Sequence, residues 1–192
     1  LTVKRKGKIQ QLVDAVDLEQ LAGTCGIAHT RWATHGEPNQ INAHPHQAGK
    51  LVVVHNGIIE NFQVLKQALS QDGHEFVSET DSEVLAHLIH DQYDGNLEEA
   101  VRRALNLVEG TYGIAVMHAD EPGKIVGARR GSPLVVGVGD GFNVLASDVA
   151  AVLGHTKQVI YLDDWDMVVL TADGVQTYDM EAHELDKEIQ EV

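Results

Sequence analysis

The chain has 192 residues, 43% of them apolar and 22% charged, which is typical of one domain with a sizeable core. Its formal net charge of -15 at pH 7 argues against nucleic acid and anionic membranes as partners, because both select a positive surface. We expect a cytoplasmic protein, since no apolar run approaches the roughly 18 residues of a membrane span and a single cysteine cannot form an internal disulfide.

The first half of the chain mixes helical and strand patterns. Thr80-Asp81-Ser82-Glu83 has the form of a capping box, and Asn61 and Asn96 are suited to cap helices. The Asn56-Gly57 pair is typical of a hairpin turn, but the polar residues after it favour a sharp exposed corner followed by a helix. The patterns predict helices over residues 14–21, 61–73, from 80 onward and over 97–109, strands over 24–30, 51–55 and 75–78, and a loop over 37–47.

The second half changes to short strands separated by turn residues. The apolar segments predict strands over residues 113–119, 124–128, 134–138, 143–146, 158–162, 167–171 and 175–178, with a short helix over 149–153. Antiparallel hairpins that follow a helical half favour an α+β fold over a doubly wound parallel sheet. We expect residues 1–180 to form one domain and the acidic, helix-compatible residues 181–192 to be a linker toward a further domain.

Polar side chains follow the strand expected over residues 24–30. Arg31, Trp32, Thr34 and His35 combine a cation, an indole and hydrogen-bonding groups, which suits the rim of a pocket for a small anionic ligand. The alternative is a strand end whose arginine makes an ordinary surface ion pair.

Two further strand exits add complementary groups. Asp81 offers a fixed anion, so together with Arg31 it matches the two charged ends of a free α-amino acid. Asn56 offers a side-chain amide beside the backbone N–H of Gly57, which is a plausible oxyanion hole for acyl transfer.

A nucleophile and a metal site are not evident from these patterns. Cys25 lies within an expected strand with no basic neighbour in sequence, so inert packing is favoured over catalysis. No metal is expected, because the sequence contains no H-E-x-x-H motif. His44 and His46 would also point to opposite faces if their segment is extended. The clustered histidines are His29, His35, His44, His46 and His55.

Five polar motifs follow one another along the chain: His29-Thr-Arg-Trp-Ala-Thr-His-Gly36, Asn42-Ala-His-Pro-His46, His55-Asn-Gly-Ile-Ile-Glu-Asn61, Ser78-Glu-Thr-Asp81 and Gly131-Ser-Pro-Leu134. In wording and order they resemble the glutaminase domain of the glucosamine-6-phosphate synthases (glutamine–fructose-6-phosphate aminotransferases). The resemblance covers essentially the whole chain. It implies a class II glutamine amidotransferase with an N-terminal-nucleophile hydrolase fold, an αββα sandwich that lacks its first strands here.

The resemblance also implies a substrate and its contacts. L-Glutamine would be hydrolysed through a γ-glutamyl thioester, and the ammonia would convert fructose 6-phosphate to glucosamine 6-phosphate in hexosamine biosynthesis. Arg31 would hold the glutamine α-carboxylate, helped by Thr34 and His35. Asp81 and Gly57 would hold the α-ammonium group.

The remaining roles concern catalysis. Asn56 and the Gly57 N–H would form the oxyanion hole, and Trp32 would belong to a loop that closes over glutamine. The family's nucleophile is a cysteine that opens the mature chain, with its own α-amine as the base. This sequence begins at Leu1, and Cys25 is internal, so we expect this chain alone to be inactive.

The resemblance implies no cofactor. It implies a C-terminal sugar-isomerase domain as a partner within a longer protein, which we expect to be a homodimer. Two alternatives stay open: another class II amidotransferase, such as a phosphoribosyl-pyrophosphate or asparagine-forming enzyme, and a non-catalytic glutamine-sensing module.

Overall fold

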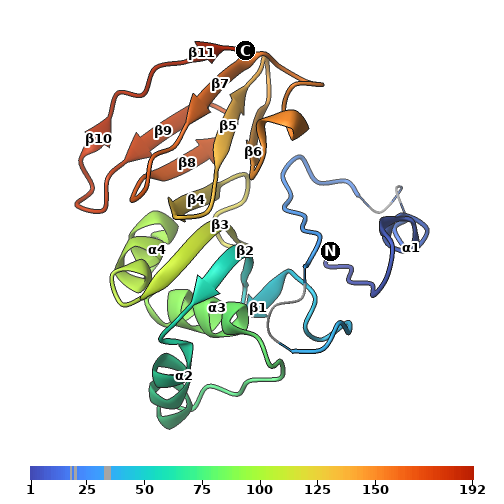
Figure 1. The fold of residues 1–192 in the computed structure, drawn as a ribbon, viewed down its shortest axis with the longest axis vertical. Helices are drawn as coiled ribbons and strands as arrows, with labels where there is room; N and C mark the ends of the chain where they lie inside the picture. Colours follow the sequence, from blue (N-terminus) through green and yellow to red (C-terminus); the bar gives the residue numbers. More distant parts are fainter. Residues whose placement is uncertain (18, 20, 33–35) are drawn as a thin grey trace.

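The computed structural model describes residues 1–17, 19, 21–32 and 36–192, and its described part contains two antiparallel sheets with helices packed against one of them (Figure 1). None of its helices has the length and apolar character that a membrane crossing requires. The larger sheet has the strand order β1-β2-β3-β4-β8-β9-β10. Its strands are β1 (His46–Ala48), β2 (Leu51–Ile59), β3 (Gly110–His118), β4 (Ile125–Arg130), β8 (Met167–Thr171), β9 (Gly174–Tyr178) and β10 (Glu184–Leu185).

The smaller sheet has the order β11-β7-β5-β6 and carries the expected hairpin of the second half. β5 pairs with β6 from Val135 opposite Ala146 to Val138 opposite Asn143, around the turn at residues 139–142. Its strands are β5 (Val135–Val138), β6 (Asn143–Ala146), β7 (Gln158–Tyr161) and β11 (Gln190–Glu191).

Three helices cover the outer face of the larger sheet, with α3 packed on β1 and β2 and flanked by α2 and α4 (Figure 1). The predicted caps of two of them are confirmed. The Thr80 hydroxyl accepts the Glu83 N–H at the start of α3, and the Asn96 side chain accepts the Glu99 N–H at the start of α4. The helical segments are α1 (Ile9–Val13), α2 (Phe62–Gln71), α3 (Asp81–Asp91), α4 (Leu97–Leu105) and the 3-10 turn η2 (Val149–Ala151).

Alternation along the central strands divides the core into layers. In β8, Met167 and Val169 join the core beneath the helices, whereas Val168 and Leu170 join the core between the two sheets. Successive strand residues point to opposite faces, so a fully apolar strand can serve both layers. The described order of layers is therefore helices, larger sheet, smaller sheet and the short η2.

Several predicted elements differ from the structure. The helix expected over residues 14–21 is instead α1 at Ile9–Val13, with Leu18 and Gln20 outside the described residues. Residues 24–30 and 75–78 form no strands, and the helix-compatible residues 181–192 contain the edge strands β10 and β11. Each of these segments is short and mostly exposed, so few buried contacts reinforce its local pattern.

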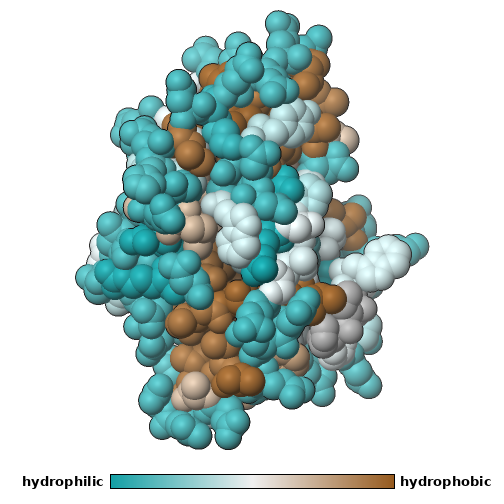
Figure 2. Space-filling model, turned by 60° about the vertical axis from the view of Figure 1, so that its left-hand side comes forward, coloured by the Kyte–Doolittle hydropathy of each residue, from teal (hydrophilic) through white to brown (hydrophobic). Residues whose placement is uncertain are grey.

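Most of the face shown in Figure 2 is hydrophilic, which agrees with the strongly negative formal charge. Brown apolar side chains gather over its lower half. The most exposed large apolar side chain among the described residues is that of Trp32, which is 91% exposed. An indole with so little protein around it is a notable surface feature beside the polar cluster described below.

Candidate active site

The end of β2 is an irregular strand and not the sharp corner that the Asn56-Gly57 pair suggested. β2 runs on to Ile59, paired with β3 throughout, so the predicted corner is wrong. Gly57 has a φ of 124°, and a Cβ on it would lie 2.2 Å from the Thr111 carbonyl oxygen. Glycine is therefore required here by both the backbone conformation and the approach of β3.

At the end of β2, two backbone N–H groups donate to side chains and not to carbonyl groups of β3. The Ile58 N–H donates to the Thr111 hydroxyl at 3.2 Å, and the Ile59 N–H donates to Oδ2 of Asp81 at 2.9 Å. Asp81 is the first residue of α3 and only 4% exposed. A helix N-terminus favours a carboxylate, so both the helix and β2 hold this anion in place.

Asn56 is exposed at the same end of β2, and a histidine fixes its side chain. Its Oδ1 lies 2.8 Å from Nε2 of His29. Because a carboxamide oxygen can only accept, His29 carries a proton on Nε2 and the amide N–H groups of Asn56 face elsewhere. No acceptor for them is found in the described part of the chain, so they can donate to a ligand oxygen.

A chain of imidazoles connects Asn56 to the start of α3. The rings of His29 and His44 lie 4.1 Å apart between centroids, and those of His44 and His46 lie 4.9 Å apart. Nε2 of His46 then lies 3.1 Å from the Thr80 hydroxyl. His44 lies in a bend and not in an extended segment, so the alternation of faces that would separate the rings of His44 and His46 does not apply here.

The charges of Arg31 and Asp81 both act on this chain of imidazoles. Burial is the main cause that lowers the pKa of His46 to about 4. The cations Lys4 and Arg31 lower the pKa of His46 further, whereas the carboxylates of Glu83 and Asp81 raise it. The contacts agree with this: Arg31 lines one cavity with His29 and His44, and Asp81 directly follows Thr80, whose hydroxyl contacts His46.

Arg31 is half-buried, and its guanidinium nitrogens lie 3.4 Å from the carbonyl oxygens of Gly36 and Glu37. These are long contacts to neutral acceptors. Trp32 follows directly and is exposed. The other two residues expected at this rim, Thr34 and His35, lie outside the described residues.

A second polar network supports the start of α3. The Glu83 carboxylate accepts the backbone N–H groups of Val77 and Ser78 at 2.9 and 2.7 Å, and also the Ser78 hydroxyl. These hydrogen bonds lower the pKa of Glu83, although burial alone would raise it. Asn42 joins the same region through its contacts with Glu79. Only half of the predicted capping box is therefore formed, because Glu83 accepts the N–H groups of Val77 and Ser78 while the Thr80 N–H donates to the Ser78 hydroxyl.

Cys25 has the properties of an unreactive thiol. It is half-buried, and burial raises its pKa above the ordinary value, opposed by the Gly26 backbone. Reactive cysteines have the opposite shift. A raised pKa reduces the share of thiolate at neutral pH, and the assignment of Cys25 as an inert side chain stays a prediction.

One group among the described residues could offer three ligand atoms to a metal. Asp179, Glu181 and His183 lie on the turn between β9 and β10, with ligand atoms within 4.8 Å of one another. They are mostly exposed, and His183 is already hydrogen-bonded to Asp179 at 2.9 Å. Their contacts with one another account for the cluster, so we assign no metal to it.

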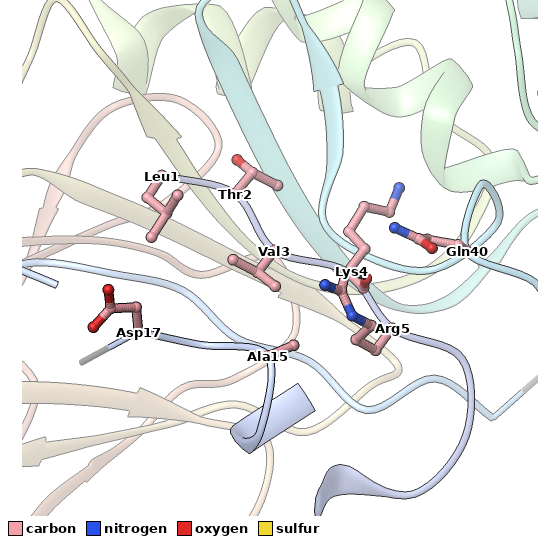
Figure 3. Close-up of a pocket in the computed structure, with 8 residues that line it drawn as sticks. All are labelled: Leu1, Thr2, Val3, Lys4, Arg5, Ala15, Asp17 and Gln40. Atoms are coloured by element: carbon pink, nitrogen blue, oxygen red, sulfur yellow. Dashed lines mark hydrogen bonds between the residues drawn. The ribbon is translucent and has the colours of Figure 1, made fainter. Parts of the chain in front are cut away.

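Two cavities adjoin the first residues of the chain. One, of about 160 Å³, is lined by Arg31, His29 and His44 together with residues 3–9. The other, of about 380 Å³ and shown in Figure 3, is lined by residues 1–5 with Ala15, Asp17 and Gln40 and contains none of the predicted site residues. The smaller cavity is the one that adjoins the polar cluster.

The buried histidines predict a loss of stability in acid. His46 has a pKa of about 6.5 when unfolded and about 4 when folded, so the unfolded chain binds more protons in this range. The free energy of unfolding should fall as the pH decreases from 6.5 to 4, by about 3 kcal/mol from this group. Burial lowers the pKa of His44 in the same direction. Urea unfolding at several pH values measures the effect.

Two substitutions distinguish the contribution of His46 to acid destabilisation from the contributions of other groups. H46Q should flatten the dependence of the unfolding free energy on pH. H183Q is the control, because hydrogen bonding to Asp179 raises the pKa of exposed His183 and its removal should not flatten the curve. A wild-type protein whose stability is constant between pH 6.5 and 4 contradicts the prediction.

The sequence patterns predict Arg31, Asn56, Gly57 and Asp81 as site residues, and these roles stay predictions. They do not predict the contact of His29 with Asn56. The spacing of histidines along the chain gave no signal for this, because the contacts link residues 27 to 34 positions apart.

Solved structures with similar folds define the class of this protein. The glutamine phosphoribosylpyrophosphate amidotransferase from B. subtilis superposes with a TM-score of 0.67 at 26% identity, over 81% of this chain and 35% of that one. A glutamine aminotransferase class-II domain protein from Silicibacter pomeroyi shares the fold alone, with a TM-score of 0.53 at 20% identity over 72% of this chain and 70% of that one. The fold is that of the class II amidotransferases among the N-terminal-nucleophile hydrolases.

Sequence comparison narrows this class to a family. The family model of the glutamine amidotransferase domain matches residues 29–154, and the chain belongs to this family. It is 52% identical over 192 residues to the glutamine–fructose-6-phosphate aminotransferase (isomerizing) of Thermus thermophilus, which covers 99% of this chain and 32% of that protein. The corresponding protein of Methanothermobacter thermautotrophicus is 51% identical over 98% of this chain and 32% of its own length. The chain thus spans about a third of these curated relatives.

Proposed function

We propose that this chain is the glutamine-binding, glutaminase domain of a glutamine–fructose-6-phosphate aminotransferase. The observation that carries the proposal is the arrangement of a guanidinium, a buried carboxylate and an exposed carboxamide around one cluster of histidines. Family membership and about 50% identity to proteins of that name support it. The amination of fructose 6-phosphate, a sugar-isomerase domain and a homodimer are proposals for the longer protein.

The charged groups suit a free α-amino acid. Arg31 would bind the α-carboxylate of glutamine, since a guanidinium forms strong paired hydrogen bonds to carboxylates. Asp81 would bind the α-ammonium group together with the Gly57 backbone. A glutamine residue within a peptide lacks both free charges, so this pair of contacts selects a free amino acid.

The uncharged groups suit the chemistry at the side-chain amide. In the chemistry of this class a base takes the proton of a thiol, the thiolate adds to the amide carbon, and the amide oxygen becomes an oxyanion. The base then returns the proton to the amide nitrogen, which leaves as ammonia, and water releases glutamate from the thioester. The free N–H groups of Asn56 and the N–H of Gly57 would stabilise the oxyanion. Trp32, exposed beside this region, would cover the bound substrate and exclude water.

The residues proposed to bind glutamine are distinct from the nucleophile that turnover requires. Cys25, the one cysteine of the sequence, is internal and has a raised pKa, so it does not meet the requirements of the nucleophile. We therefore assign Cys25 no part in turnover. A binding measurement tests the site independently of the nucleophile.

Calorimetric titration of L-glutamine into wild type and R31A is the test of the proposal. R31A should weaken binding by roughly 10- to 100-fold, because it removes a charge-assisted contact. 4-Aminobutanamide, which lacks the carboxylate, should bind wild type and R31A equally weakly. R130A is the matched control, since Arg130 stacks over Trp165 at 4.1 Å and should leave the affinity unchanged. Equal affinities of wild type and R31A for glutamine would remove Arg31 from this role.

A further inference from the structure

His55 has a defined protonation state in the structure. Its ring is 4% exposed, with Nε2 3.3 Å from the Thr111 carbonyl oxygen and Nδ1 2.9 Å from the Ser82 hydroxyl oxygen. A carbonyl oxygen can only accept, so Nε2 carries the proton. Burial lowers the pKa of His55, which keeps the ring neutral and leaves Nδ1 as an acceptor. The Ser82 hydroxyl must therefore donate its proton to Nδ1.

The protonation state of His55 determines which hydrogen bonds the Asp81 carboxylate can accept. Oδ2 of Asp81 accepts the Ile59 N–H, while Oδ1 lies 3.5 Å from the Ser82 hydroxyl. A hydroxyl has one proton to donate, and here it is already directed at His55. No other donor to Oδ1 is found in the described part of the chain. A buried anionic oxygen thus keeps unused accepting capacity, which is unfavourable unless a ligand supplies the donor.

We propose that Ser82 and His55 are positioning residues that keep Oδ1 of Asp81 open for the ammonium group of a free amino acid. This inference rests on the proposed glutamine site and adds to it the reason why the carboxylate is available. Neither residue touches the ligand in this arrangement. Their effect passes through the direction of a single hydroxyl proton.

Protonation of His55 reverses the arrangement. With protons on both ring nitrogens, Nδ1 donates to Ser82, and the hydroxyl proton turns toward Oδ1 of Asp81. The carboxylate is then capped by Ser82, and an ammonium group has to displace that contact. Asp81 on α3 favours protonation of His55 and His29 opposes it, while Ser82 and the Thr111 carbonyl are the uncharged groups in contact with the ring. Affinity for an amino acid should therefore fall in acid.

Titrations of L-glutamine into wild type, S82A and S82T between about pH 5.5 and 8 test the proposal. S82T keeps the hydroxyl and should bind within about twofold of wild type. S82A removes the donor to Nδ1, so His55 gains a proton more readily and pairs with Asp81. Glutamine affinity of S82A should fall by about 10-fold near neutral pH, and the midpoint of its pH profile should rise. Glutaramate, which lacks the amine, should bind wild type and S82A alike.

The outcomes separate the two proposals. A wild-type protein that binds no glutamine contradicts the proposed function, whatever S82A does. Glutamine binding by wild type with an unchanged affinity and pH profile in S82A overturns the inference and leaves the site intact. The nitrogen NMR signals of the His55 ring in the wild-type protein give a test that needs no variant. A ring protonated on Nε2 alone near pH 7.5 is expected, and a proton on Nδ1 contradicts the proposal.

Discussion

Replacing Gly57 with alanine is expected to lower the free energy of unfolding by about 3 kcal/mol or more. Two costs add at this position. A φ of 124° strains any residue with a Cβ, and that Cβ would lie 2.2 Å from the Thr111 carbonyl oxygen, in the strand beside it. Backbone atoms of a central strand pair cannot move aside as a flexible side chain can. Chemical denaturation of G57A against wild type measures the loss.

Two other glycines serve as controls for Gly57. Gly123 also has a positive φ, of 81°, but a Cβ there meets nothing within 4 Å, so G123A should show only the smaller cost of strain, about 1 kcal/mol. Gly110 repeats the crowded case, because its Cβ would lie 2.1 Å from the Ile58 carbonyl oxygen. G110A should therefore resemble G57A. Equal losses in G57A and G123A would show that the close approach of β2 and β3 is not what requires glycine.

The sequence predicted those parts of the fold that local chemistry determines. Thr80 and Asn96 cap their helices as expected, because a capping side chain and the N–H that it accepts are three residues apart. The strands at residues 143–146 and 167–171 have the predicted bounds, since turn residues flank each apolar run. The α+β class follows from these elements.

The parts that were missed depend on contacts between distant residues. Asn56-Gly57 is a common turn signal, but β3 pairs with this segment along its whole length and keeps it in the sheet. The same is true of the site. Local patterns predict its charged residues as candidates, whereas the contact of Asn56 with His29 and of Asp81 with the Ile59 N–H arises only when the chain is folded. Tertiary packing decides which side chains meet.

The substitution D81N should weaken glutamine binding by about 100-fold or more, a larger loss than R31A causes. Asp81 is 4% exposed, so its charge acts on a ligand through little water. Asparagine has nearly the same shape, and its side-chain oxygen can still accept the Ile59 N–H. The start of α3 should therefore keep its place, and circular dichroism with urea unfolding can verify that the variant is folded.

A ligand without the amine shows whether this loss comes from the ammonium contact. Wild type should bind L-glutamine far more tightly than glutaramate, whereas D81N should bind the two ligands with similar affinity. D91N is the matched control, because Asp91 is at the other end of the same helix, exposed, and beside His74 at 3.5 Å. If D81N still prefers glutamine over glutaramate as strongly as wild type does, the ammonium group is bound elsewhere. Asp81 would then have a role other than binding the ammonium group.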